Sequence, residues 1–90
     1  MIKREFIQEV AERSGLLQKD VDEVIKLSLE IIKREVKGGG EVTFNNFGRF
    51  FKKDYEEREL SHPKTGEIIK VPAHSGLMFK PSQKLREIFK

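Results

Sequence analysis

The sequence predicts an α+β fold in which two N-terminal helices precede a three-stranded antiparallel sheet and a short C-terminal helix. Apolar residues recur at intervals of three and four through residue 37, which is the spacing of amphipathic helices. From residue 42 onward they recur at intervals of two, which is the spacing of strands. The triple glycine 38–40 separates the two patterns, so the helices are expected to come first in the chain.

The first helix is expected over about 3–14, since glycine at position 15 can adopt the left-handed conformation that ends a helix. Charged and amide side chains separate its apolar residues, which are Phe6, Ile7, Val10 and Ala11. The chain is thereby predicted to begin with a short amphipathic helix.

The second helix is expected over about 18–37 and carries an unusually wide apolar stripe. One seam comprises residues 21, 25, 32 and 36, and a neighbouring seam comprises residues 24, 27 and 31. A single partner helix covers less surface than this. The surplus face is therefore expected to meet a second subunit, although packing against the chain's own sheet is compatible with the same pattern.

Strands are expected from residue 42, where Val42 and Phe44 alternate with polar residues and Phe47 to Phe51 follow. Asn45-Asn46 supplies a turn, because asparagine tolerates positive φ. The next stretch, 52–60, is strand-length but almost wholly charged, so little of it can cover a core. With a turn at 61–66 and a returning strand at 67–72, it is predicted to form a long hairpin arm that protrudes into solvent.

A short helix is predicted after Pro81, with Ser82 as its N-cap and a buried face of Leu85, Ile88 and Phe89. The expected organisation is one domain over 1–90. Its parts are a helical dimerisation base at about 1–40, a β-saddle with its arm at about 41–80, and the C-terminal helix at about 82–90.

Composition points to association with a second chain. A 90-residue chain buries only about 60% of the surface that its unfolded form exposes, so a monomer is marginally stable. The sequence has no cysteine for a disulfide and no Cys/His cluster for a structural metal. A dimer is therefore expected.

Net charge is modest at +3, but its distribution is uneven. Residues 70–90 carry five basic side chains against one acidic side chain, whereas residues 1–50 carry nine of each. A basic block of this kind either attracts a polyanion or is simply a solvated surface. No apolar stretch reaches the roughly 18 residues of a membrane span, so a cytoplasmic location without membrane contact is expected.

Catalysis is not expected from this set of side chains. The only histidines are His62 and His74, there is no cysteine, and the carboxylates are scattered among lysines. Two histidines without a third ligand make a poor metal site. The glycine run 38–40 lacks the lysine and serine or threonine of a phosphate-binding loop. We therefore expect no enzyme activity, metal, cofactor or small-molecule substrate.

Several short motifs, in order, resemble those of the bacterial histone-like DNA-binding family that includes HU and integration host factor. Residues 46–50, Asn-Phe-Gly-Arg-Phe, are similar to the family's Gly-Phe-Gly-x-Phe. Residues 63–67, Pro-Lys-Thr-Gly-Glu, are similar to its Asn-Pro-x-Thr-Gly-Glu arm tip. Pro72-Ala73 and Phe79-Lys80-Pro81, with a following Lys84-Leu85, extend the likeness over the full length of the chain.

The resemblance implies an intertwined dimer, either a homodimer or a heterodimer with a paralogue, that binds double-stranded DNA at the nucleoid. In that family two β-arms follow the minor groove and a proline at each tip wedges between base pairs, which assigns the wedge here to Pro63. Contacts to DNA phosphates and grooves are implied for Lys3, Lys53, Arg58, His62, Lys64, Lys70, Lys80, Lys84 and Arg86. A dimer core is implied for Phe44, Phe47, Phe50 and Phe79, although aromatic rings beside basic residues also occur in single-strand binders.

The arm departs from the family pattern because it is acidic. Asp54, Glu56, Glu57 and Glu59 precede a tip that reads Ser61-His62-Pro63, where the family commonly has Arg-Asn-Pro. If the strand alternates regularly, neither face of it is free of carboxylates. The expected function is a largely sequence-neutral DNA-bending protein, and the alternative is a structural or protein-interaction dimer of the same fold whose acidic arm weakens DNA binding.

Overall fold

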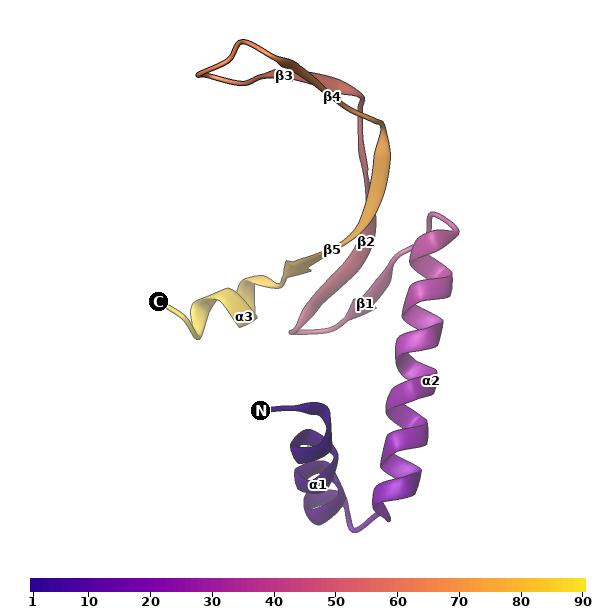
Figure 1. Ribbon diagram of the computed structural model, residues 1–90. Coiled ribbons are helices and arrows are strands. Elements are labelled where there is room, and N and C mark those ends of the chain that lie inside the picture. Colours follow the sequence, from indigo (N-terminus) through magenta and orange to yellow (C-terminus); the bar gives the residue numbers. More distant parts are fainter. The chain divides into compact units, whose positions relative to one another are not determined.

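The computed structural model describes residues 1–90 and has the element order α1, α2, β1 to β5, α3 (Figure 1). The chain forms two compact units, Met1–Arg34 and Glu35–Lys90, and the boundary between them lies inside helix α2. The predicted single domain over 1–90 stays a prediction. No helix combines the length and the apolar character that a membrane-spanning segment requires.

The first unit contains α1 (Lys3–Ser14) and most of α2 (Gln18–Lys37), with the boundaries that the apolar spacing predicted. Gly15 has a φ of 76° and its N–H donates to the Ala11 carbonyl over 2.9 Å, which closes α1 in the left-handed conformation. The core of this unit is small. Ile7, Ala11 and Val21 are buried, and Val10 and Ile25 pack against them.

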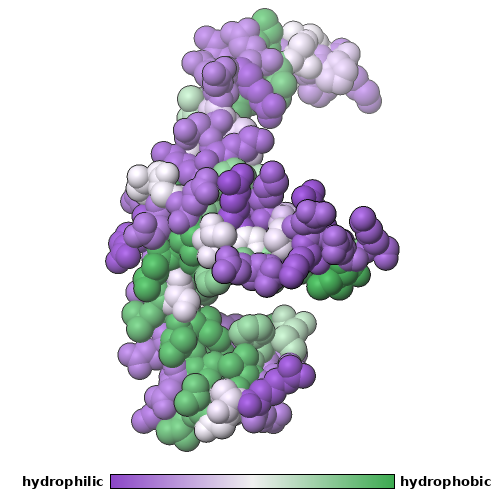
Figure 2. Space-filling model, turned by 180° about the vertical axis from the view of Figure 1, so that it is seen from behind, coloured by the Kyte–Doolittle hydropathy of each residue, from purple (hydrophilic) through white to green (hydrophobic).

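The wide stripe of α2 is only partly covered within one chain. Val24 and Leu29 are 58% and 53% exposed, and Leu27 and Ile31 are close to half exposed. In the space-filling view of Figure 2, hydrophobic residues gather over the helices, whereas the arm is mostly hydrophilic. No large side chain of the chain is fully buried. The single chain therefore leaves a large apolar surface in water, and such surfaces usually mark an interface.

The second unit is built on a three-stranded antiparallel sheet in the order β1-β2-β5. Strand β1 (Val42–Phe44) pairs with β2 (Gly48–Tyr55), which pairs along its whole length with β5 (His74–Pro81). The turn between β1 and β2 uses Asn46, which has a φ of 64°, and the Phe47 N–H donates to the Phe44 carbonyl. The predicted asparagine turn is confirmed.

The arm continues as a separate two-stranded sheet of β3 (Arg58–Ser61) and β4 (Ile68–Val71). The last rung of the β2–β5 ladder is Tyr55↔His74 and the first rung of the arm is Arg58↔Val71, so two residues on each side interrupt the pairing. Pro72 lies in this interruption and has no N–H to donate. The sequence predicted continuous strands here, and the break divides each of them in two. Figure 1 shows the β3–β4 hairpin bending over at this point, toward the side on which α3 lies.

Helix α3 (Gln83–Glu87) is shorter than predicted. Ser82 is its N-cap, as predicted, and its Oγ accepts a hydrogen bond from the Leu85 N–H over 3.1 Å. The predicted buried face of the helix is wrong for Ile88 and Phe89, which are 73% and 81% exposed. The physical reason is that the helix ends before them, so only Leu85 is half-buried.

The register of the sheet sorts its side chains onto two faces, because partners across a ladder share a face and neighbours along a strand alternate. The face that we call the core face carries Val42, Phe44, Phe50, Leu77 and Phe79, and nearer the arm it also carries Lys52, Asp54 and Ser75. The opposite face, which we call the cationic face, carries Thr43, Arg49, Phe51, Lys53, Tyr55, His74, Met78 and Lys80.

Gly48 is expected to be essential for this register. A Cβ at this buried position would lie 2.5 Å from Phe79 Cζ and 2.6 Å from the Lys80 carbonyl oxygen, and a backbone oxygen cannot move away cheaply. Gly48→Ala should therefore lower the free energy of unfolding by about 2 kcal/mol, measured by urea denaturation. Gly76→Ala is the matched control in β5, because a Cβ there meets nothing within 4 Å. Equal stability of the two variants would contradict the expected close packing at Gly48.

Candidate nucleic-acid interface

The cationic face alternates positive and aromatic side chains along β2. The Arg49 guanidinium lies 5.2 Å from the centre of the Phe51 ring, and the Lys53 ammonium lies 5.2 Å from the centre of the Tyr55 ring. Each aromatic ring thus stabilises the position of a neighbouring cation through a cation–π contact. The face presents positive charge over an apolar layer.

Tyr55 and His74 close the β2–β5 ladder at the root of the arm. Their rings stack with centroids 4.8 Å apart and an interplanar angle of 12°. The Tyr55 hydroxyl also lies 3.6 Å from the Met78 sulfur, and the His74 Nδ1 lies 3.0 Å from the Pro72 carbonyl oxygen. These contacts hold the last rung before the interruption, so the bend of the arm starts from an ordered base.

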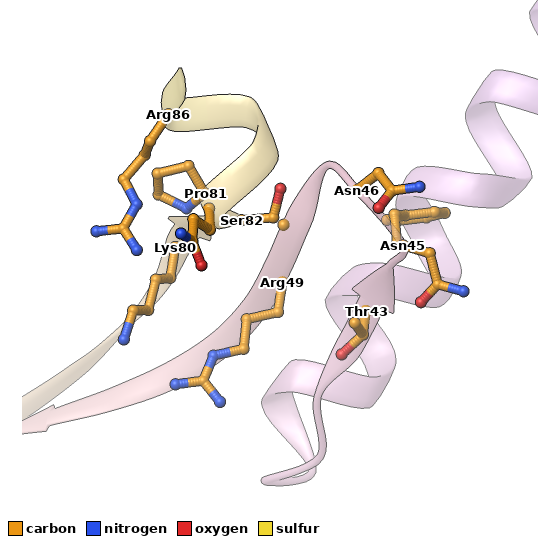
Figure 3. A pocket seen from close by; sticks show the side chains of 11 residues that line it. Thr43, Asn45, Asn46, Arg49, Lys80, Pro81, Ser82 and Arg86 are labelled. Atoms are coloured by element: carbon orange, nitrogen blue, oxygen red, sulfur yellow. The ribbon is translucent and has the colours of Figure 1, made fainter. Parts of the chain in front are cut away.

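Three cations line a pocket of about 420 Å³ where the sheet meets α3. Arg49 comes from β2, Lys80 from β5 and Arg86 from α3, and Figure 3 shows the three side chains extending in the same direction. Only one carboxylate is bonded to this group, since Glu41 Oε2 lies 3.5 Å from an Arg49 nitrogen. The remaining lining residues are mostly polar: Thr43, Phe44, Asn45, Asn46, Gly48, Pro81, Ser82 and Gln83. A pocket of cations, amides and hydroxyls suits a phosphate group.

The tip of the arm is a four-residue turn, 63–66, closed by bonds between its ends. The His62 N–H donates to the Glu67 carbonyl over 2.8 Å, and the Gly66 N–H donates to the His62 carbonyl over 2.9 Å. Gly66 has a φ of 73°, which other residues rarely adopt. Pro63 and Lys64 are exposed at this tip. The proline is therefore presented at the far end of the arm on a well-defined turn.

The His62 ring stabilises the same turn. Its Nδ1 lies 3.2 Å from the Lys64 nitrogen and 3.4 Å from the Thr65 nitrogen, and it accepts from these two backbone N–H groups. A neutral ring whose Nδ1 accepts carries its proton on Nε2. The Nε2–H thus remains available as a donor to a ligand.

The other predicted contact residues are dispersed. Arg58 and Lys70 lie on the two strands of the arm, and Lys84 is exposed on α3. Lys3 belongs to the first unit, where its ammonium forms an ion pair with Asp22 over 3.2 Å. A shallow pocket of about 470 Å³ surrounds that pair, lined by Lys3, Arg4, Ile7, Gln18, Lys19 and Asp22. The structure thus groups Lys53 and Lys80 with Arg49 on one face, with Arg86 beside them.

The phenylalanines of the core face pack against one another. Phe50 contacts both Phe44 and Phe79, with ring centroids 6.3 Å and 5.0 Å away, and Phe47 lies 5.4 Å from Phe79. Phe44 and Phe47 are nevertheless close to half exposed, and Phe79 is 37% exposed. The cluster is apolar, lies opposite the cationic face and is incompletely covered by one chain.

The expectation that no face of the arm is free of acid is wrong within the four rungs of the β3–β4 ladder, and Glu67 follows directly after the last rung. In the β3–β4 register, Arg58 and Leu60 share a face with Val71 and Ile69, whereas Glu59 lies on the opposite face with Lys70. The expectation assumed one strand that alternates regularly through 52–60. The strand is interrupted at 56–57, so Glu56 and Glu57 belong to neither the β2–β5 ladder nor the β3–β4 ladder.

The sequence reasoning missed the role of Arg49 and the Tyr55–His74 stack. A signal for Arg49 was present, because Arg49, Phe51, Lys53 and Tyr55 alternate cation and aromatic ring with the period of a strand. No local sequence pattern predicts the Tyr55–His74 stack, because the whole arm lies between these two residues in the chain.

A basic sheet face, a cationic pocket beside it and an exposed arm define a small nucleic-acid-binding protein. Comparison with known proteins agrees. The family model described as bacterial DNA-binding protein matches residues 1–90. The integration host factor α subunit of Sodalis glossinidius is 34% identical over 86 residues, which cover 96% of this chain and 88% of that protein.

Solved structures extend the comparison to the fold. HU in an Anabaena HU–DNA cocrystal structure superposes with a TM-score of 0.88 at 34% identity, covering 99% of this chain and 97% of that one. HU from Thermotoga maritima has a TM-score of 0.70 at 27% identity, with both chains fully covered. The chain therefore belongs to the bacterial DNA-binding protein family, the family of HU and integration host factor. It is an architectural DNA-binding protein and not an enzyme.

The Glu41–Arg49 ion pair is expected to limit DNA binding. Glu41→Gln should free the Arg49 guanidinium for a DNA phosphate and raise affinity about twofold at low salt, with little change in stability because exposed pairs contribute little. Fluorescence anisotropy with a labelled duplex measures the affinity. Glu12→Gln, which removes an exposed carboxylate of α1, is the control for net charge. An equal gain in that control would show that Glu41 has no local effect.

Proposed function

We propose that this protein binds duplex DNA with little regard to sequence and bends it by placing its β-arms in the minor groove. The observation that carries the proposal is the concentration of positive charge on one face of the β2–β5 ladder and in the pocket beside it. Contacts of this kind go to phosphates, which are present in every sequence. Sequence preference then comes mainly from how easily a site bends.

The DNA contact that we propose for each residue follows from its position in the fold. Lys53, Lys80 and Arg86, together with Arg49, contact phosphates from the saddle and its pocket. The arm contributes Arg58, Lys70, His62 through its Nε2–H, and Lys64. Lys84 extends the basic surface along α3, and Lys3 contacts the flanking DNA once its bond to Asp22 is exchanged for a phosphate.

Pro63 is proposed to wedge between base pairs at the tip. An apolar ring on an ordered turn can fill the gap that opens when two base pairs unstack. Unstacking costs a few kcal/mol per step, and the additional contacts of the bent duplex offset this cost. The proline thus converts binding by the arms into a bend.

The functional species is proposed to be a dimer in which the two chains form one DNA-binding domain. The half-exposed stripe of α2 and the partly covered phenylalanines Phe44, Phe47, Phe50 and Phe79 supply the apolar surface that such a dimer buries. Its place of action is the nucleoid in the bacterial cytoplasm.

Bending of the DNA and binding of its phosphates are expected to depend on different residues, so different substitutions should impair them. Pro63→Ala should reduce the bend, measured by energy transfer between the labelled ends of a nicked duplex, while the dependence of affinity on salt stays the same. Lys80→Ala should keep the bend and lower the slope of log affinity against log salt by about 0.9, measured between about 50 and 200 mM. Absence of binding by the wild type at low salt would favour the alternative dimer with a protein partner.

The dimer is expected in solution without DNA. Sedimentation at micromolar concentration should give twice the chain mass of 10.5 kDa. Leu27→Glu on the exposed stripe should dissociate or unfold the protein, because the dimer would bury the carboxylate without a partner. Lys26→Glu, at the exposed neighbouring position, should keep the dimer. A monomer of wild-type stability would refute this prediction.

A further inference from the structure

The ring of His62 holds the middle of the tip turn, residues 63–66. The backbone bonds of His62 fix only the two ends of this turn. Between the ends, the N–H groups of Lys64 and Thr65 donate to the ring Nδ1 over 3.2 Å and 3.4 Å, and the structure gives them no other acceptor. Pro63 lies inside the loop that the ring closes and has no N–H of its own. The orientation of the proline therefore depends on the His62 ring.

These two bonds require the neutral form of His62. Nδ1 accepts through its lone pair, and a proton on Nδ1 would occupy that lone pair. An imidazolium has two donors and no acceptor, so it cannot bond to the N–H groups of Lys64 and Thr65. Histidine is the side chain that changes charge between about pH 5 and 8. The cap on the turn is therefore present in neutral solution and is lost in mild acid.

The charged groups near His62 favour the same direction. Lys64, in the turn itself, repels an imidazolium that stays over the turn. Glu67 begins the return of the chain and offers the imidazolium a carboxylate outside the turn. Glu59 and Lys70 are partners across the β3–β4 ladder further from the tip, where their opposite charges offset each other.

His74, at the root of the arm, uses its ring in the opposite way. Its Nδ1 lies 3.0 Å from the Pro72 carbonyl oxygen, which can only accept, so Nδ1 is the donor. A proton added at Nε2 leaves that bond in place, and it leaves the ring stacked on Tyr55. Attraction of the imidazolium to the Tyr55 ring offsets repulsion from Lys53, which lies over the same ring. Mild acid thus releases the tip and keeps the root.

We propose that His62 is a positioning residue for Pro63, and that loss of its cap in mild acid reduces DNA bending. This inference rests on the function proposed above, which assigns the bend to Pro63. A preordered turn presents the proline ring at no further entropic cost, whereas a loosened turn must be ordered on binding. Added positive charge strengthens phosphate binding, so a smaller bend in acid has the opposite sign to a charge effect.

Substitutions at the two histidines provide a matched experiment. His62→Asn keeps the cap at every pH, because the asparagine oxygen accepts from backbone N–H groups two residues further on and does not titrate in this range. His62→Ala removes the cap at every pH. His74→Asn removes the other histidine of the arm and is the control for acid in general. The full-length protein is studied by ¹⁵N NMR without DNA, and bending is measured by energy transfer between the labelled ends of a nicked duplex at fixed salt.

In the free protein near neutral pH, His62 is expected to carry its proton on Nε2 and His74 on Nδ1. The amide ¹⁵N shifts of Lys64 and Thr65 should change together with the His62 ring as the pH falls. Between about pH 8 and 5.5, the ratio of bent to straight duplex should fall about fivefold for the wild type and for His74→Asn, which is the effect of about one net hydrogen bond. His62→Asn should bend DNA equally at both pH values, and His62→Ala should bend it equally weakly at both.

A bend that is unchanged or larger in acid would overturn the inference, because attraction of the imidazolium to phosphate would then dominate. An equal decline in His62→Asn would overturn it as well, and so would Lys64 and Thr65 amide shifts that do not follow the titration of the ring. A wild-type protein that bends no duplex at any pH would instead refute the proposed function, while the NMR titration would still decide whether His62 caps the turn.

Discussion

The antiparallel ladder between β2 and β5 fixes nearly every functional feature of the second unit. It runs without a slip from Gly48↔Pro81 to Tyr55↔His74, and its register places Phe50 and Phe79 on one face and Arg49, Lys53 and Lys80 on the other. A shift of one residue would exchange the two faces, because side chains alternate with a period of two. The close approach of Gly48 to Phe79 and to the backbone of Lys80 leaves no room for a larger residue at the start of this ladder.

The same ladder explains why the chain requires a partner. Its core face holds a phenylalanine cluster that one chain covers only in part, and α2 leaves about half of its apolar stripe in water. In a small protein that has no cysteine and no cluster of metal-binding side chains, burial of this surface between two chains is the main available source of stability. The same sheet therefore supplies apolar surface for dimer formation on one face and positions the cations on the other.

The pairing of the arm decides which of its charges share a face. Its pairing stops at 56–57 and 72–73, where Pro72 cannot donate, and resumes with Arg58 and the aliphatic residues on one side. Glu59 is thereby separated from Arg58, Leu60, Ile69 and Val71, and it lies across the ladder from Lys70 on the other face. Net charge is a poor guide to such a surface, because the ligand meets one face at a time.

The sequence by itself determined both N-terminal helices, the asparagine turn, the Ser82 cap and the family, since these depend on local spacing, on capping and on short motifs in order. It did not determine the interruption of the arm, the early end of α3 before Ile88, or the grouping of Arg49 with Lys80 and Arg86. The interruption and the grouping of the cations depend on pairing between residues far apart in the chain, whereas α3 ends in local bonds from the Ile88 and Phe89 N–H groups to the Leu85 and Arg86 carbonyls. Only the tertiary structure decides which side chains such pairing brings onto one face.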